Sequence, residues 1–111
     1  MIYTNEIIEA SRGQLFSGMT EREQMQFCAG EIHRAYDRKE IEPEERKVAA
    51  WAEELVADIR KRYKGITSAE IALALQYGLA ENFTKDTRLV GSNFLLWLER
   101  YMTAPERIQA V

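Results

Sequence analysis

Apolar side chains recur at spacings of three and four residues along most of the chain, which is the pattern of amphipathic helices. The clearest stripe consists of Val48, Trp51, Ala52, Leu55, Val56, Ile59 and Tyr63. Pro43 before it suits the first turn of a helix, and Gly65 after it suits a C-terminal cap. The pattern therefore predicts a helix over residues 43–64, roughly 31 Å long, as the central element of the fold.

Capping boxes predict the starts of two further helices. Thr20 with Glu23, and Thr67 with Glu70, have the spacing at which the threonine hydroxyl and the glutamate cap each other's backbone N–H groups. The first box precedes a helix over residues 21–38. The second precedes a helix whose buried side is marked by Ile71, Ala74, Leu75 and Gly78 or Leu79.

The two ends of the chain are also predicted to be helical. Thr4 is suited to cap a helix over residues 4–16, and residues 82–92 are predicted to form a connector. Ser92 is then expected to cap a last long helix. Its apolar residues are Phe94, Leu95, Trp97, Leu98, Tyr101 and Met102. Pro105 would either stop this helix or start a last short turn.

Composition supports an all-α fold. The 111 residues include 6 glycines and 2 prolines, and residues of these two types dominate tight turns. A chain of this length forms one domain and buries enough surface to fold without a disulfide or a metal. We therefore predict a single helical domain over residues 1–111, a bundle of about five helices. Trp51 and Trp97 both lie on apolar stripes and are expected to be largely buried.

Charge is uneven although the net charge is only −3. Four cations gather at the end of the predicted central helix and could contact nucleic acid: Arg60, Lys61, Arg62 and Lys64. Cations at this end also complement the negative pole of a helix dipole, which is the simpler explanation. Tyr63 continues the apolar stripe, so it should be packed and unable to stack on a base. Any nucleic-acid binding is therefore expected to be weak, salt-sensitive and non-specific.

The sequence contains no recognisable catalytic motif. His33 is the single histidine and Cys28 the single cysteine, and they lie about 140° apart around one predicted helix. They cannot pair as base and nucleophile within that helix. Zinc patterns, glycine-rich phosphate loops and EF-hand loops are absent. We therefore expect no enzymatic activity, no metal and no cofactor, with a carboxylate site assembled from distant residues as the alternative.

The chain carries no membrane or secretion signal. Its longest apolar runs have five residues, and its first ten residues lack a basic segment followed by an apolar one. The single cysteine forms no internal disulfide. The expected location is the cytoplasm, without membrane association.

The last long helix is apolar on more sides than one neighbour covers. The residues concerned are Phe94, Leu95, Trp97, Leu98 and Tyr101. Such a helix lies either in the centre of a domain or in the interface of an oligomer. A helix near the end of a chain is less often central, so these residues are predicted to form a protein interface, such as that of a homodimer.

The last third of the chain resembles a known group of proteins. The pattern consists of Glu70-Ile71, Tyr77-Gly78 and Phe94-x-x-Trp97-Leu98-x-x-Tyr101. Over residues 67–102 it is similar to small uncharacterised helical proteins carried by bacterial prophages and conjugative elements. The resemblance implies a mobile-element protein, an accessory to DNA replication, and it carries over no catalytic residues.

Two functions follow from these observations. The first is a non-catalytic helical interaction module, an accessory or adaptor in the DNA replication of a prophage or mobile element. The alternative is a weak, non-specific nucleic-acid-binding domain that uses the basic end of the long helix.

Overall fold

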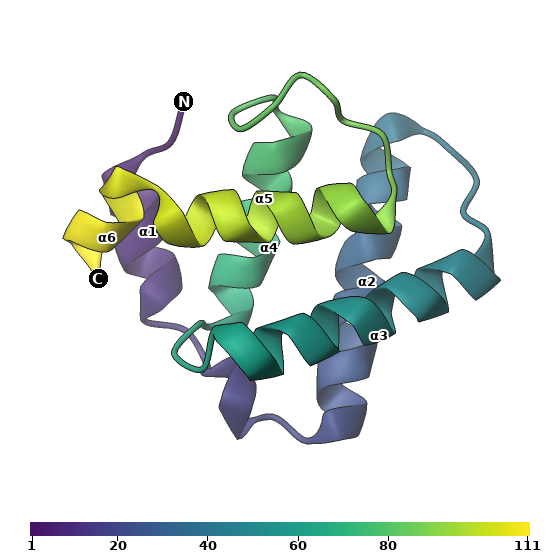
Figure 1. The fold of residues 1–111 in the computed structure, drawn as a ribbon, viewed down its shortest axis with the longest axis horizontal. Helices are drawn as coiled ribbons and strands as arrows, with labels where there is room; N and C mark the ends of the chain where they lie inside the picture. Colours follow the sequence, from purple (N-terminus) through teal and green to yellow (C-terminus); the bar gives the residue numbers. More distant parts are fainter.

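The chain folds into six α-helices and one turn of 3-10 helix in a computed structural model that describes residues 1–111 (Figure 1). The elements are α1 (Thr4–Ser11), η1 (Phe16–Gly18), α2 (Glu21–Lys39), α3 (Glu45–Arg62), α4 (Ser68–Leu79), α5 (Gly91–Thr103) and α6 (Pro105–Ala110). No β-strand forms. The predicted all-α bundle is confirmed, with a short sixth helix after Pro105.

The helices form two layers. In Figure 1, α1, α4 and α2 run side by side, with α4 in contact with both neighbours, and α3 and α5 cross in front of them. The short α6 packs against α1 and α5. The two layers meet where α3 packs against α2 and where α5 packs against α4.

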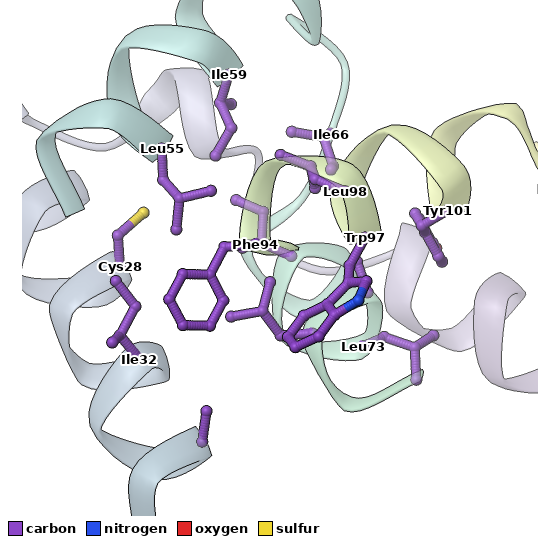
Figure 2. Packing of buried hydrophobic residues seen from close by; sticks show 14 of the residues in the cluster. Cys28, Ile32, Leu55, Ile59, Ile66, Leu73, Phe94, Trp97, Leu98 and Tyr101 are labelled. Atoms are coloured by element: carbon purple, nitrogen blue, oxygen red, sulfur yellow. The ribbon is translucent and has the colours of Figure 1, made fainter. Parts of the chain in front are cut away.

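The core is centred on α5. Phe94 and Trp97 are completely buried, and their rings meet edge to face with centroids 5.6 Å apart. Figure 2 shows the Phe94 ring directed toward Cys28 of α2 and Leu55 of α3, while Trp97 lies beside Leu73 of α4. Phe94 of α5 therefore fills the space between α2 and α3, and Trp97 covers α4.

A glycine permits the close contact between α4 and α5. A Cβ atom at Gly78 would lie 2.2 Å from Cγ and Cδ2 of Trp97, far inside the usual carbon contact distance of about 3.5–4.0 Å. The indole therefore rests directly on the backbone of α4.

Both capping boxes form as predicted. The hydroxyl of Thr20 accepts from the backbone N–H of Glu23, and the Glu23 carboxylate accepts from the backbone N–H of Thr20. Thr67 and Glu70 make the same reciprocal pair. These interactions span three residues, which is why the sequence alone located them.

Two local predictions are wrong. The first helix ends at Ser11 rather than residue 16, because Leu15 instead forms an antiparallel bridge with Thr67. Ser92 does not cap α5, which begins at Gly91 without a side-chain cap. Trp51 is partly buried and packs against the core, whereas Trp97 is completely buried.

Candidate functional site

A cavity of about 340 Å³ opens where the basic end of α3 meets η1 and the start of α2. Its lining consists of Phe16, Ser17, Met19, Gln24, Ile59, Arg60, Tyr63 and Lys64. The apolar members form most of the walls, and the two charged members are both cations. Mostly apolar walls with a few convergent polar groups are typical of ligand sites.

Hydrogen bonds to a buried glutamine hold Arg60 beside this cavity. The Gln24 side chain is only 2% exposed, and its Nε2 donates to the carbonyl oxygen of Phe16 at 2.8 Å. Its Oε1 accepts from Nε of Arg60, also at 2.8 Å. The guanidinium thus keeps its two terminal nitrogens for other partners, with only a long 3.9 Å contact from one of them to Glu21.

The backbone below the cavity is fixed by a second set of contacts. The N–H of Phe16 donates to the carbonyl of Ile66 at 3.0 Å, and the N–H of Ser68 donates to the carbonyl of Gln14 at 2.9 Å. These bonds join the η1 segment to the turn between α3 and α4. The Phe16 carbonyl that orients Gln24 therefore belongs to a rigid part of the fold.

The four predicted nucleic-acid residues differ in their contacts. Arg62 lies 3.5 Å from the Asp58 carboxylate and 5.0 Å from the centre of the Tyr63 ring. Arg60 is turned toward α2, and only Lys61 is exposed without lining the cavity or pairing with an acid. Tyr63 packs partly against the core, as predicted, and burial raises the pKa of its hydroxyl.

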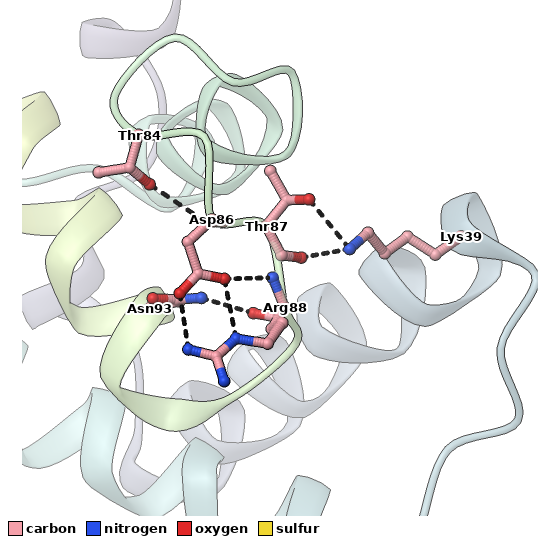
Figure 3. Close-up of polar contacts among 6 residues, drawn as sticks. All are labelled: Lys39, Thr84, Asp86, Thr87, Arg88 and Asn93. Carbon is pink, nitrogen blue, oxygen red and sulfur yellow. Dashed lines mark hydrogen bonds and ion pairs between the residues drawn. The ribbon is translucent and has the colours of Figure 1, made fainter.

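Cations of the α4–α5 connector do not extend the basic cluster. The connector runs along the opposite edge of the molecule from the end of α3 (Figure 1). Figure 3 shows the Arg88 guanidinium paired with the Asp86 carboxylate, with contacts of 3.0 and 2.8 Å that hold the pKa of Asp86 well below its usual range. Lys39 of α2 donates to the carbonyl and the hydroxyl of Thr87. These contacts order the connector and pair the charge of Arg88 with that of Asp86.

A buried ionic cluster joins α4, α5 and α6. The Glu70 carboxylate is completely buried and accepts from the Tyr101 hydroxyl at 2.7 Å and from Nε of Arg107 at 3.0 Å. Burial, followed by this hydrogen bond to Glu70, raises the pKa of Tyr101. Because the chain itself supplies these partners, the cluster fixes the position of α6 and offers no open position for a ligand.

The predicted interface on α5 is wrong for four of its five residues. Phe94, Trp97, Leu98 and Tyr101 are completely buried within the chain, and Leu95 is half-buried. Of the two places suited to an all-round apolar helix, α5 occupies the central one. The periodicity of α5 therefore no longer argues for a homodimer.

The other candidates for chemistry lie apart from the cavity. Cys28 is buried in the core, which raises its pKa to about 12. His33 lies at the surface of α2, where its Nε2 is 2.9 Å from the Glu45 carboxylate. No three His, Cys, Asp or Glu side chains lie close enough together to hold a metal ion. None of the helices combines the length and the hydropathy needed to cross a bilayer.

The sequence reasoning did not foresee the burial of the polar residues Gln24 and Glu70. Gln24 lies four residues before Cys28 and Glu70 four residues before Ala74, so both continue apolar stripes. A polar residue at a stripe position is a usable signal of burial with a partner. The sequence does not reveal the partners, Arg60 and Arg107, which are 36 and 37 residues away.

Fold and site together define a compact helical domain with an apolar cavity bordered by cations. Comparison with protein-family models, curated proteins and solved structures gives no match. The function is therefore argued from the geometry of the chain itself.

Proposed function

We propose that the chain is a non-catalytic interaction module that binds an anionic segment of a partner protein at the basic end of α3. The observation that carries this proposal is the hydrogen bond from Arg60 to the buried Gln24 beside an apolar cavity. An arginine needed only to complement the helix dipole requires no such support, because any exposed cation there serves equally well. An oriented guanidinium is suited to a planar anion such as a carboxylate.

A protein ligand explains this surface better than a nucleic acid does. Binding of single strands without sequence preference relies on aromatic rings that stack on bases. The only aromatic ring in the basic cluster is that of Tyr63, which is half-buried and covered on one side by Arg62. An apolar wall such as that of the partly exposed Met19 would be of little use to a phosphate backbone. Weak, non-specific binding of nucleic acid is the second candidate, supported by the unpaired Lys61.

The resemblance of residues 67–102 to small prophage and conjugative-element proteins suggests the biological process in which the chain would act. It implies an accessory role in the DNA replication of a mobile element. In that setting the chain would act as an adaptor, with an acidic segment of another protein as its ligand.

Fluorescence anisotropy with labelled ligands tests the proposal. One peptide combines aspartate and leucine, a second replaces each aspartate with lysine, and two oligonucleotides provide single-stranded and duplex DNA. We expect the acidic peptide to bind, the basic peptide not to bind, and DNA binding to be lost by about 200 mM salt. A variant with Arg60, Lys61 and Lys64 replaced by glutamine should no longer bind the acidic peptide.

The control removes the same charge from other exposed positions, with Arg46, Lys47 and Lys85 replaced by glutamine. This control should bind the acidic peptide like the original chain, and both variants should unfold cooperatively in urea. Equal loss of binding in the two triple variants would contradict the proposed site. DNA binding that exceeds peptide binding at about 200 mM salt would favour the nucleic-acid alternative.

A further inference from the structure

We infer that the cavity at the end of α3 receives the C-terminal residue of a partner chain, with its apolar side chain inside and its carboxylate on Arg60 and Lys64. This inference rests on the proposed function and specifies the ligand of the same site. It follows from three properties of the cavity: its size, the position of its two cations, and the way in which Arg60 is held.

The size of the cavity fits a single residue. At about 30 Å³ for each water molecule, a cavity of about 340 Å³ holds about eleven waters. A terminal leucine has about nine non-hydrogen atoms including both carboxylate oxygens, and it fits within the space of these waters. The cavity is therefore large enough for one apolar residue and too small for a folded element.

The two cations are placed to meet one carboxylate. Arg60 lies in the last turn of α3 and Lys64 in the turn that follows the helix, and both side chains line the cavity. Since Nε of Arg60 already donates to Gln24, the two terminal nitrogens are left to donate to the two oxygens of a carboxylate. Lys64 forms no ion pair within the chain and adds a second positive charge.

A chain terminus satisfies the apolar walls and the cations with one residue. In a C-terminal residue the side chain and the carboxylate share the same Cα atom, so both fit a cavity of this size. An internal acidic residue would require a second residue to supply the apolar group and a main chain that leaves in both directions. Capture of a terminal carboxylate is an established mode of peptide recognition.

Gln24 acts as a positioning residue in this site. It does not need to touch the ligand carboxylate, because its Oε1 holds Arg60 and its Nε2 is bound to the Phe16 carbonyl. Its replacement by leucine removes both hydrogen bonds. Arg60 would then lose the orientation that makes it selective for a carboxylate.

The test uses three acetylated tetrapeptides, and nuclear magnetic resonance titration reports their binding. One ends in leucine with a free carboxylate, the second ends in leucine amide, and the third ends in serine with a free carboxylate. We expect the first to bind at least about tenfold more tightly than either of the others, because each lacks one of the two recognised groups. The resonance of the Arg60 Nε–H should shift only with the peptides that carry a carboxylate.

Matched variants locate the binding. Lys64→Gln should weaken binding of the leucine acid several-fold, whereas Lys61→Gln removes the same charge outside the cavity and should change it less than about twofold, as expected for a screened surface charge. In Gln24→Leu, the ratio of the affinity for the leucine acid to the affinity for the leucine amide should fall toward one. If Gln24→Leu weakens the binding of the leucine acid and the leucine amide equally, then Gln24 has only a structural effect and is not a positioning residue.

Three results would overturn the inference. Equal binding of the leucine acid and the leucine amide would exclude recognition of the terminal carboxylate. An equal loss of affinity for the leucine acid in Lys61→Gln and Lys64→Gln would show that the carboxylate is recognised by charges outside the cavity. If the aspartate–leucine peptide of the earlier test binds while the leucine acid does not, the terminal-residue inference fails and the proposed function stands; if neither binds, both fail.

Discussion

The packing of Trp97 on the backbone of α4 leads to a sharp prediction for Gly78→Ala. The new methyl group would lie 2.2 Å from two ring atoms of Trp97, and the indole is completely buried. Phe94 closes one side of the indole at a centroid distance of 5.6 Å, so the ring has little room to move. Either the ring must leave its rotamer or α4 and α5 must separate.

The expected magnitude follows from two opposing terms. Alanine is more favourable than glycine within a helix by about 1 kcal/mol. Overpacking of a close-packed core usually costs about 1–3 kcal/mol and sometimes more. Because the overlap at Gly78 exceeds 1 Å relative to normal carbon contacts of about 3.5–4.0 Å, the cost lies at the upper end of that range. The net loss in the free energy of unfolding should be about 1–3 kcal/mol.

Urea denaturation followed by circular dichroism measures this loss, and Gly30→Ala is the matched control. Gly30 also lies inside a helix, but a Cβ atom there would meet nothing within 4 Å. Only the helix preference then acts, so Gly30→Ala should stabilise the chain by about 0.5–1 kcal/mol. The same substitution should therefore have opposite signs in α2 and α4.

A second variant tests the cause of the loss. In a Trp97→Leu background the clash is removed, so adding Gly78→Ala should no longer destabilise the chain. Stabilisation by Gly78→Ala alone, of the size seen for Gly30→Ala, would refute the reasoning. It would mean that the indole does not rest on the backbone of α4.

Three further predictions concern other parts of the chain. Arg107→Ala should lower the free energy of unfolding, measured by urea denaturation, by about 1–3 kcal/mol, because the buried Glu70 carboxylate loses a hydrogen-bond donor. Adding Glu70→Gln to this variant should recover part of the loss, and no recovery would contradict this explanation. Tyr77 has a pKa raised to about 12, chiefly by burial, so the native state holds its proton more tightly than the unfolded chain does. Stability should therefore decline from about pH 10 upward, and a Tyr77→Phe curve that is no flatter between about pH 10 and 12 would argue against this. The buried Cys28, with a pKa raised to about 12, should react far more slowly with a disulfide reagent in the folded chain than in urea, and equal rates would show that the thiol is accessible.

Local interactions account for what the sequence alone determined about this protein. The apolar stripe of α3 and the capping boxes at Thr20 and Thr67 are contacts between residues three or four positions apart, and such contacts are visible in the order of residues. They were sufficient to predict the fold class and the starts of α2 and α4. They also placed Arg60 in the last turn of α3, at the site of the proposed function.

Tertiary structure decided the location of the first helix's end, the place of α5 and the partners of the buried polar groups. Leu15 leaves the helical pattern because it bridges to Thr67, and Glu70 is buried because Tyr101 and Arg107 reach it from 31 and 37 residues away. The periodicity of α5 suited both a core helix and an interface, and only the packing of α2, α3 and α4 around it decided between them. A hydrophobic pattern reports how much surface must be buried, but it does not specify which part of the chain, or which other chain, covers that surface.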